Sequence, residues 1–227
     1  MSSLYLTLNL GSIAIPFLAS FHPRLKFYRR WKHLLLSVII TSLIFILWDI
    51  YFTENGVWGF NENYLIGVYL FSLPIEEWLF FFCIPYACIF SHYAIQELAP
   101  NLKLSMKIVK VITGLLLLSF LLLTVFNYTK LYTLFNYVLA FLVLLMTYIF
   151  KPQLLERYIL TFLFMLIPFF LVNGILTGTF IENEVVWYNN LENLGLRIGT
   201  IPFEDITYAF TLILLSLFLM TSFDKKY

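Results

Sequence analysis

The sequence contains few charged side chains. Only 12% of its 227 residues are Asp, Glu, Lys or Arg, and 61% are hydrophobic, whereas soluble domains carry roughly 25% charged residues. This shortage of charge excludes a soluble globular domain and indicates an all-α integral membrane protein with several spans. The formal net charge of +1 is uninformative. The basic segment from Arg24 to Lys32 is interpreted as a topology determinant, so no nucleic-acid partner is expected.

Cysteine, histidine and nucleotide-binding motifs are also scarce. Cys83 and Cys88 lie in one apolar run, a setting that suits neither a disulfide nor a zinc site. None of His22, His33 and His92 stands at metal-ligand spacing from another. The chain has no Gly-x-Gly-x-x-Gly motif for a dinucleotide. We therefore expect neither a metal ion nor a bound cofactor such as a flavin.

The apolar residues fall into seven segments close to the ~20 residues that a helix needs to cross a ~30 Å hydrocarbon core. The first segment has no positive charges before it, so we interpret it as an uncleaved span rather than a signal peptide. A shorter apolar stretch, residues 64–71, is predicted to be interfacial or re-entrant. The seven predicted spans are residues 4–20, 34–51, 75–95, 105–126, 131–150, 158–177 and 203–222.

Lys and Arg residues are concentrated on one side of these spans. Lys130 and Arg197 alone fall on the other side. Because cytoplasmic loops are enriched in Lys and Arg, we predict a multi-pass protein of the plasma membrane with its N-terminus outside and its C-terminus cytoplasmic. The twelve residues assigned to the cytoplasmic side are Arg24, Lys26, Arg29, Arg30, Lys32, Lys103, Lys107, Lys110, Lys151, Arg157, Lys225 and Lys226.

The chain also repeats itself. Tyr5 and Tyr132 are 127 positions apart within similar Leu-Tyr segments that end in Asn9 and Asn136, and Pro74 and Pro202 are 128 positions apart. We also match Trp58 with Trp187. A nearly constant offset indicates a duplication. We predict a parallel 3+1+3 arrangement with a pseudo-two-fold axis along the membrane normal, divided into a first repeat (1–98), a connecting helix (99–127) and a second repeat (128–227).

Two acidic turns stand out within this repeat. Glu76 and Glu77 follow Pro74, and Glu204 and Asp205 follow Pro202, each pair at the head of an apolar helix. Acidic residues within spans are expensive and mark candidate functional sites. Adjacent helical residues point about 100° apart, so one acid of each pair is expected to face inward. Proline followed by acids also suits a purely structural helix start, and that alternative stays open.

A further acid and several aromatic residues are candidates for the same site. Asp49 lies near the outer end of the second span, and its approximate repeat equivalent is Asn173. Aromatic faces can stabilise a cation, although packing explains any one of these residues equally well. The aromatic candidates are Trp48, Trp58, Trp78, Phe80, Phe81, Tyr86, Trp187 and Tyr208.

These motifs together resemble the integral-membrane lycopene cyclase family, as in the cyclase part of fungal bifunctional phytoene synthase/lycopene cyclases. The resemblance rests on Pro-Ile-Glu-Glu-Trp-Leu-Phe-Phe at residues 74–81, Trp48-Asp49, Trp58 and the second Pro-Phe-Glu-Asp turn. It covers essentially the whole chain as two fused repeats. The second repeat departs from the first by Asp205 for Glu77 and by Asn173 for Asp49.

The resemblance implies an intramolecular lyase, or isomerase, that closes the ends of lycopene, or of a related acyclic carotenoid, to β-ionone rings. The product would form through γ-carotene to β-carotene. The implied acid–base centre is Glu76, Glu77, Glu204, Asp205 and Asp49, with Glu76 and Glu77 favoured first. A carboxyl group in low dielectric can keep its proton, and a second can remain charged to stabilise a cation. The expected partners are the carotenoid, the lipid bilayer and other enzymes of the carotenoid pathway.

Other functional classes share some of these sequence features. A small seven-helix proton-coupled transporter has the same layout of three, one and three spans, and it is the main alternative. A retinal-binding photoreceptor needs a lysine in its last span, and residues 203–222 contain none. A structural partner in a carotenoid complex is a third interpretation.

Overall fold

The computed structural model of the protein describes residues 3–224, in which seven α-helices form a single bundle. Two predicted cytoplasmic lysines, Lys225 and Lys226, lie outside the described residues. The helices are α1 (Leu4–Ala19), α2 (Trp31–Glu54), α3 (Ile75–Leu98), α4 (Met106–Phe126), α5 (Leu131–Phe150), α6 (Pro152–Leu176) and α7 (Phe203–Phe223). A 3₁₀ helix (Phe27–Arg30) precedes α2, and another (Glu62–Tyr64) follows it.

These helices agree with the predicted segments to within about three residues at most ends. The main difference is α6, which begins at Pro152 rather than at residue 158, because proline is well suited to the first helical turn. Within residues 64–71, residues 66–71 are exposed and include the short strand β2 (Tyr69–Leu70). This stretch is therefore an exposed loop with a short strand, and its predicted interfacial or re-entrant position stays a prediction.

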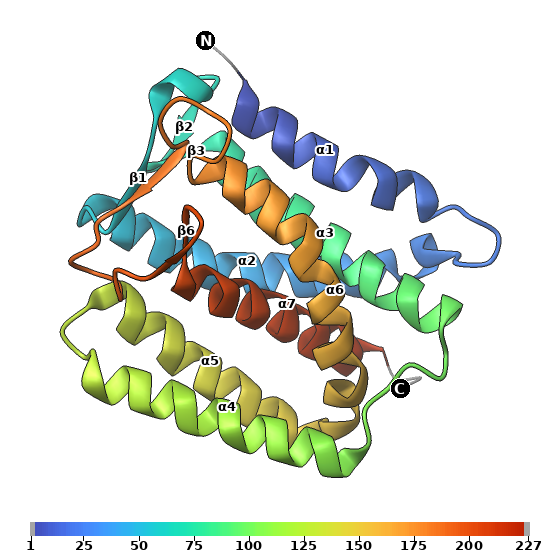
Figure 1. Ribbon diagram of the computed structural model, residues 1–227. Helices are drawn as coiled ribbons and strands as arrows, with labels where there is room; N and C mark the ends of the chain where they lie inside the picture. Colours follow the sequence, from blue (N-terminus) through green and yellow to red (C-terminus); the bar gives the residue numbers. More distant parts are fainter. Residues whose placement is uncertain (1–2, 225–227) are drawn as a thin grey trace.

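The protein is a multi-pass membrane protein by the length and composition of its helices. Within residues 3–224, six helices are long and apolar enough to cross a membrane, namely all but α1. Helix α1 is apolar but has 16 residues, which at 1.5 Å per residue span about 24 Å. It lies alongside α3 for most of its length (Figure 1).

The packing of the helices follows the duplication. Helix α1 packs on α3 as α5 packs on α7, and α2 contacts α7 as α6 contacts α3 (Figure 1). Helix α4 lies outside this frame, against α5. The first three helices therefore correspond to the last three, and α3 and α7 occupy the centre of the bundle.

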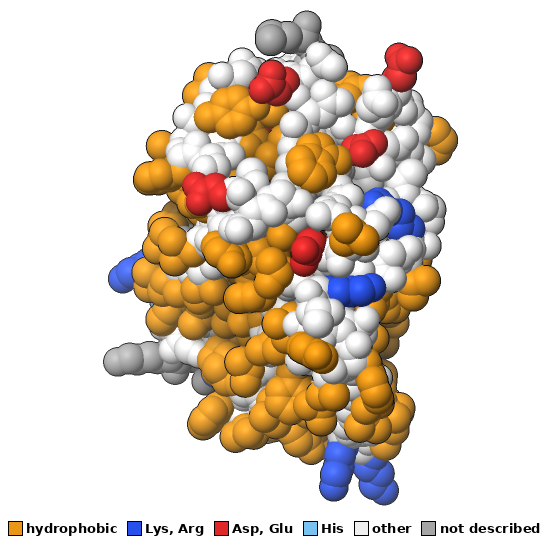
Figure 2. Space-filling model, turned by 90° about the vertical axis from the view of Figure 1, so that its left-hand side faces the viewer, with side chains coloured by type: hydrophobic (Ala, Val, Ile, Leu, Met, Phe, Trp, Pro, Cys, Tyr) orange, Lys and Arg blue, Asp and Glu red, His pale blue; other side chains and the backbone are white. Residues whose placement is uncertain are grey.

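The loops before α3 and α7 lie at the same end of the bundle and are joined by antiparallel strands β1 (Trp58–Phe60) and β4 (Val186–Tyr188). Each loop also has its own hairpin, formed by β2 with β3 (Leu73–Pro74) and by β5 (Arg197–Ile198) with β6 (Ile201–Pro202). Figure 2 shows this end of the molecule, where acidic side chains are scattered among apolar ones. The exposed acids here are Glu54, at the end of α2, and Glu62, Glu182 and Glu184 in the two loops.

The β1–β4 pairing identifies the local symmetry axis. The Asn61 amide donates to the Val185 carbonyl (2.8 Å), and the Asn189 amide donates to the Val57 carbonyl (2.9 Å). The two donors, Asn61 and Asn189, are 128 positions apart, and so are the two acceptors, Val57 and Val185. Gly59 pairs with Trp187 at the same offset, so this pair lies on the pseudo-two-fold axis.

The predicted match of Trp58 with Trp187 is therefore wrong. Trp58 pairs with Tyr188 in the β1–β4 ladder, and Phe60 pairs with Val186. At an offset of 128, the equivalent of Trp58 is Val186 and the equivalent of Trp187 is Gly59. The two tryptophans occupy different environments, because Trp58 is buried and Trp187 is 39% exposed.

Gly59 gives a test of this pairing. A Cβ atom added to Gly59 would lie 2.4 Å from the Trp187 ring, and overpacking of this kind costs about 1–3 kcal/mol. We expect Gly59→Ala to lower the thermal unfolding temperature in detergent. Gly114→Ala on α4 is the control, because a Cβ there meets no atom within 4 Å. Equal unfolding temperatures for the two variants would contradict the register.

Candidate active site

The two acids of each acidic turn point in different directions. Glu76 Oε1 accepts the Ile66 amide (2.7 Å), and Glu204 Oε1 accepts the Leu194 amide (2.7 Å). Both contacts return to the loop that precedes the helix, ten residues earlier. Glu204 also accepts a bond from Thr133 (2.7 Å). The first acid of each turn therefore fixes the loop against the start of its own helix.

The second acid of each turn faces the neighbouring helix of its repeat. The Tyr5 hydroxyl on α1 donates to Glu77 Oε2. In the second repeat the Tyr132 hydroxyl on α5 donates to Asp205 Oδ1 (2.6 Å). All four side chains are buried. An unpaired carboxylate would be costly here, and each repeat supplies a tyrosine at the equivalent position to satisfy it.

Two buried asparagines hold the same helix pairs together. Asn9 Nδ2 donates to the Glu76 carbonyl (2.7 Å), and Asn136 Nδ2 donates to the Glu204 carbonyl (2.8 Å). A carbonyl in the first turn of a helix keeps capacity for a second bond, because it has two lone pairs. These bonds fix the height of α1 against α3 and of α5 against α7, and this places each tyrosine beside its acid.

The third partner of each acid differs between the repeats. Asp49 on α2 lies within electrostatic reach of Glu77, and its Oδ1 accepts the Trp58 indole N–H (2.6 Å). In the second repeat, Asn173 on α6 donates to Asp205 Oδ2 (2.8 Å). The predicted correspondence of Asp49 with Asn173 is thus matched by their contacts. One repeat pairs two carboxyl groups, and the other pairs a carboxyl group with an amide.

Asp205 has one more donor, the hydroxyl of Tyr188 (3.0 Å). Burial raises the pKa of Tyr188, and the neighbouring Asp205 raises it further, so this phenol keeps its proton. Asp205 therefore accepts three hydrogen bonds, from Tyr132, Tyr188 and Asn173. Bonds donated to a carboxylate favour its charged form.

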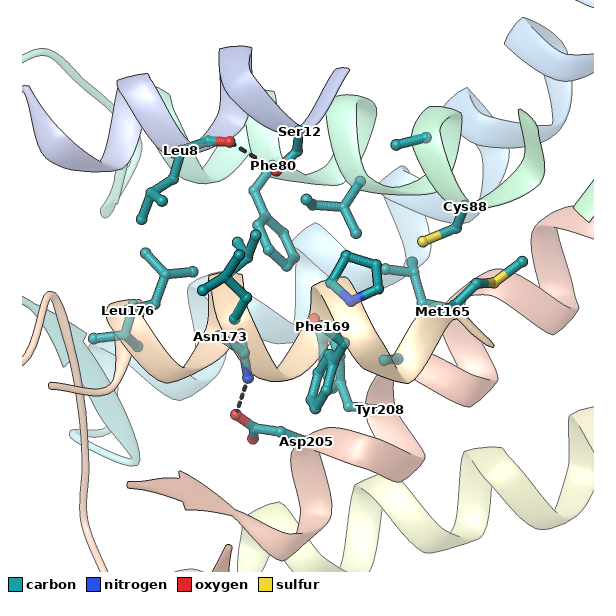
Figure 3. A pocket seen from close by; sticks show the side chains of 18 of the residues that line it. Leu8, Ser12, Phe80, Cys88, Met165, Phe169, Asn173, Leu176, Asp205 and Tyr208 are labelled. Atoms are coloured by element: carbon teal, nitrogen blue, oxygen red, sulfur yellow. Dashed lines mark hydrogen bonds between the residues drawn. The ribbon is translucent and has the colours of Figure 1, made fainter. Parts of the chain in front are cut away.

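Both second acids line one cavity of about 560 Å³ between α1, α3, α6 and α7. Figure 3 shows Leu8 and Ser12 of α1 on one side of it and Met165, Phe169, Asn173 and Leu176 of α6 on the other, with Asp205 bonded to Asn173. Tyr208 also lines it, within electrostatic reach of both Glu77 and Asp205. Most of the lining is apolar. The polar residues near the acids are Tyr5, Glu77, Tyr132, Asn173, Tyr188 and Asp205.

The predicted aromatic residues divide into two groups. Trp58, Phe80 and Tyr208 line the cavity, and the other five lie outside it. Trp48 packs against Tyr208, and Phe81 packs against Phe45. Trp78 donates a hydrogen bond to the Leu70 carbonyl, and Tyr86 is hydrogen-bonded to Ser20 and Trp31. Trp187 covers Gly59.

The sequence interpretation did not select Tyr5, Tyr132, Tyr188, Asn9 or Asn136 as site residues. Tyr5, Asn9 and their equivalents were visible as a repeated Tyr-x-x-x-Asn pattern. These residues could have been identified as polar residues that recur at the repeat offset within apolar helices. Tyr188 corresponds to Phe60 in the first repeat. Because Phe60 has no hydroxyl group, no repeated polar pattern pointed to Tyr188.

No group of three His, Cys, Asp or Glu side chains within residues 3–224 is arranged to hold a metal ion. The cavity between the helices instead presents two carboxyl-bearing clusters to an apolar space. Such an arrangement can donate a proton and accept one at sites shielded from bulk water.

Glu204 provides a stability test that is separate from any activity. Glu204→Ala removes the acceptor of the Leu194 amide and of Thr133, and a buried donor left without a partner costs about 1–3 kcal/mol. Glu204→Gln keeps an acceptor oxygen at the same place. We expect the alanine variant to unfold at a lower temperature than the glutamine variant. If both variants unfold alike, the carboxyl oxygen does not hold the loop.

Comparison with known proteins agrees with the geometry. The family model described as lycopene cyclase matches residues 2–95 and 129–223. Each matched region contains one acidic turn with its tyrosine and asparagine. No curated protein and no solved structure matches the chain. The family match covers most of the chain in two regions, and the chain therefore belongs to the lycopene cyclase family.

Proposed function

We propose that the protein closes the ends of lycopene to β-ionone rings, through γ-carotene to β-carotene, by a redox-neutral, proton-initiated reaction. Membership of the family supports an enzyme of carotenoid cyclisation with a carotenoid substrate. One observation carries the more specific proposal: Glu77 and Asp205, from equivalent positions of the two repeats, line the same apolar cavity. An acid and a base can therefore act on one substrate end.

The cavity suits a hydrocarbon that is already dissolved in the bilayer. Its lining is mostly aliphatic and aromatic, and its carboxyl and amide groups are gathered at the end near the acidic turns. Ser12 and Ser91 also line it, and their hydroxyls donate to carbonyls of their own helices. A polyene has no polar groups to desolvate, so its transfer from lipid into such a cavity costs little. Exclusion of water also protects a carbocation from capture as an alcohol.

The Asp49–Glu77 pair is the proposed proton donor. Two buried carboxyl groups that are electrostatically coupled do not both ionise easily, so we propose that the pair holds a proton. Asp49 is fixed by the Trp58 indole, and Glu77 is fixed by the Tyr5 hydroxyl. Of the two, Glu77 lines the cavity and delivers the proton.

Asp205 is the proposed anionic partner. Burial opposes a charge on this group, and its three hydrogen-bond donors counteract burial by favouring the carboxylate form. A fixed negative charge stabilises the positive charge that develops on the substrate. The same carboxylate can accept the proton that is released when the ring is complete.

The reaction balances without a cofactor. A proton adds to the terminal double bond and leaves a tertiary cation, a second double bond of the same chain attacks it, and the ring cation loses a proton. One C–C bond forms, and no atoms are gained or lost. Trp58, Tyr132 and Tyr208 lie together at the acids, with ring centroids 5.1 Å apart for Trp58 and Tyr132. Their faces can stabilise the intermediate cations.

Glu76 and Glu204 take a different role in this proposal. Neither lines the cavity, and each carboxyl binds the backbone of its own loop. They are positioning residues that set the turn from which Glu77 and Asp205 project. The sequence alone favoured Glu76 and Glu77 together as the reacting pair. The proposal assigns this role to Glu77 and Asp49 instead.

The membrane topology and the division into two repeats, both predicted from the sequence, are also proposed. We propose seven spans with the N-terminus outside and the acidic turns near the outer face of the plasma membrane, in repeats 1–98 and 128–227 joined by 99–127. Lys130 and Arg197 are at the end of the bundle with the acidic turns, and Arg24, Arg30 and Arg157 are at the other. The positive-inside rule supports this orientation.

The transporter interpretation receives less support from the same observations. A proton-coupled permease for a polar solute needs polar groups along its path. Here the carboxyl and amide groups gather at one end of a mostly apolar cavity, and the hydroxyls of Ser12 and Ser91 bond to their own helices. We therefore propose the cyclase alone.

Substitution of the acids tests the proposed roles. In lycopene-accumulating bacteria, Glu77→Gln and Asp205→Asn should lower ring formation by about 10²-fold or more, because each removes acid–base function. Glu76→Gln keeps an acceptor for the Ile66 amide and is the matched control, with ring formation expected within about threefold of the unsubstituted protein. Chromatography of the pigments and immunoblotting of the membranes give the readout. Full activity of Glu77→Gln would contradict the assignment.

The difference between the repeats gives a second test. Asp49→Asn makes the first cluster resemble the second, so it should remove the shared proton and lower the rate by about 10²-fold. Asn173→Asp places a second carboxyl group beside Asp205. Because the clusters are equivalent, the Asp49→Asn/Asn173→Asp double variant should recover part of the activity. A double variant no more active than Asp49→Asn would show that the clusters cannot exchange roles.

A further inference from the structure

The cavity reaches the outer surface of the bundle between α1 and α6. Two of its lining residues are mostly exposed, Ile15 of α1 at 75% and Leu171 of α6 at 60%. Gly11, four residues before Ile15 on α1, also lines the cavity, and an added Cβ there would meet no atom within 4 Å. Figure 3 shows side chains of the two helices on opposite sides of this space. The cavity thus has an opening at the side of the bundle.

This opening faces the apolar part of the surface. Gly11 and Ile15 lie near the middle of α1, and Pro168 and Leu171 lie in the second half of α6. The exposed large side chains near them on the same two helices are all hydrophobic: Leu10, Leu18, Phe164 and Ile167. A surface of this composition contacts lipid chains, so the opening connects the cavity with the bilayer and not with water.

The duplication creates an equivalent gap between α2 and α5, and that gap is closed. Trp48 and Phe52 of α2 and Phe135 of α5 pack against each other there. The ring centroids are 5.7 Å apart for Trp48 and Phe52, 5.5 Å for Phe52 and Phe135, and 6.3 Å for Trp48 and Phe135. Trp48 also meets Tyr208 at 5.5 Å.

At the α1–α6 opening, the residues equivalent to Trp48, Phe52 and Phe135 are aliphatic. Helices α2 and α6 align at the Asp49–Asn173 offset of 124, and α1 and α5 align at the Tyr5–Tyr132 offset of 127. Trp48 and Phe52 therefore correspond to Val172 and Leu176, and Phe135 corresponds to Leu8. All three aliphatic residues line the cavity. Aromatic side chains close one gap, and smaller ones leave the other open.

We infer that the acyclic polyene enters sideways from the bilayer through the α1–α6 opening, and that the protein holds one end of it at a time. The identity of the polyene rests on the proposed function; the lateral opening does not. With one opening and one cavity, the unreacted remainder of the chain stays in the lipid. Closure of the second end requires release and a second passage through the same opening.

Bulky substitutions at the opening test this inference. Gly11→Trp and Leu171→Trp place an indole on each side of it. Gly114→Trp and Leu118→Trp are matched controls on α4, where Gly114 has no atom near its Cβ position and Leu118 is 54% exposed. Each protein is purified from lycopene-accumulating bacteria. The total bound carotenoid then reports access, and the cyclised fraction reports chemistry.

We expect the two opening variants to bind about tenfold less carotenoid, equivalent to about 1.4 kcal/mol, while both controls and the unfolding temperatures stay near those of the unsubstituted protein. Unchanged binding in Gly11→Trp and Leu171→Trp would overturn the lateral opening. Bound but wholly uncyclised carotenoid in the unsubstituted protein would overturn the proposed function and leave the opening standing. A doubly cyclised first product, with no singly cyclised precursor in excess lycopene, would overturn the passage of one end at a time.

Discussion

The structure depends on one constraint, the need to satisfy carboxyl groups inside an apolar helix bundle. An acid at this depth is tolerated only with partners, because desolvation of a charged group costs several kcal/mol. Each repeat meets the requirement in the same way: a tyrosine of its first helix donates to the second acid of its third helix. Four residues along from that tyrosine, an asparagine binds the backbone of the same acidic turn. These contacts fix the α1–α3 and α5–α7 pairs, and they bring both acids to a common cavity.

The two repeats differ at a few positions of this symmetric arrangement, and the proposed reaction depends on these differences. At one position a carboxyl group in the first repeat is replaced by an amide in the second: Asp205 accepts a bond from Asn173, whereas we propose that Glu77 shares a proton with Asp49. At another, Trp48 closes a gap that Val172 leaves open. A strictly symmetric bundle would have two similar acids and two similar openings. In our proposal, the asymmetric one separates a proton donor from an anion and has a single route for the substrate.

Much of this arrangement was predictable from the sequence. Helix positions, the duplication and the acidic turns follow from hydropathy, a constant offset and the cost of buried acids. Which acid of each turn faces the cavity did not follow, because a 100° separation shows that Glu76 and Glu77 diverge without showing which one points inward. The error at Trp58 has a clear cause. The offset is 124 between Asp49 and Asn173 but 128 between Pro74 and Pro202, so the second loop is four residues longer and the tryptophans align by coincidence. Long-range partners such as Tyr188 depend on strand pairing across the axis, which no local pattern reveals.

The central claim is that Asp49 and Glu77 hold a proton that Asp205 lacks. Infrared spectroscopy of the membrane-reconstituted protein measures this directly, because a protonated carboxyl group has a C=O stretching band distinct from that of a carboxylate. Difference spectra between the unsubstituted protein and single variants isolate the contribution of each group. The account predicts that Glu77→Gln and Asp49→Asn each remove a protonated-carboxyl component, and that Asp205→Asn removes only a carboxylate component. Loss of the protonated band in Asp205→Asn, with its retention in both of the other variants, would contradict the account.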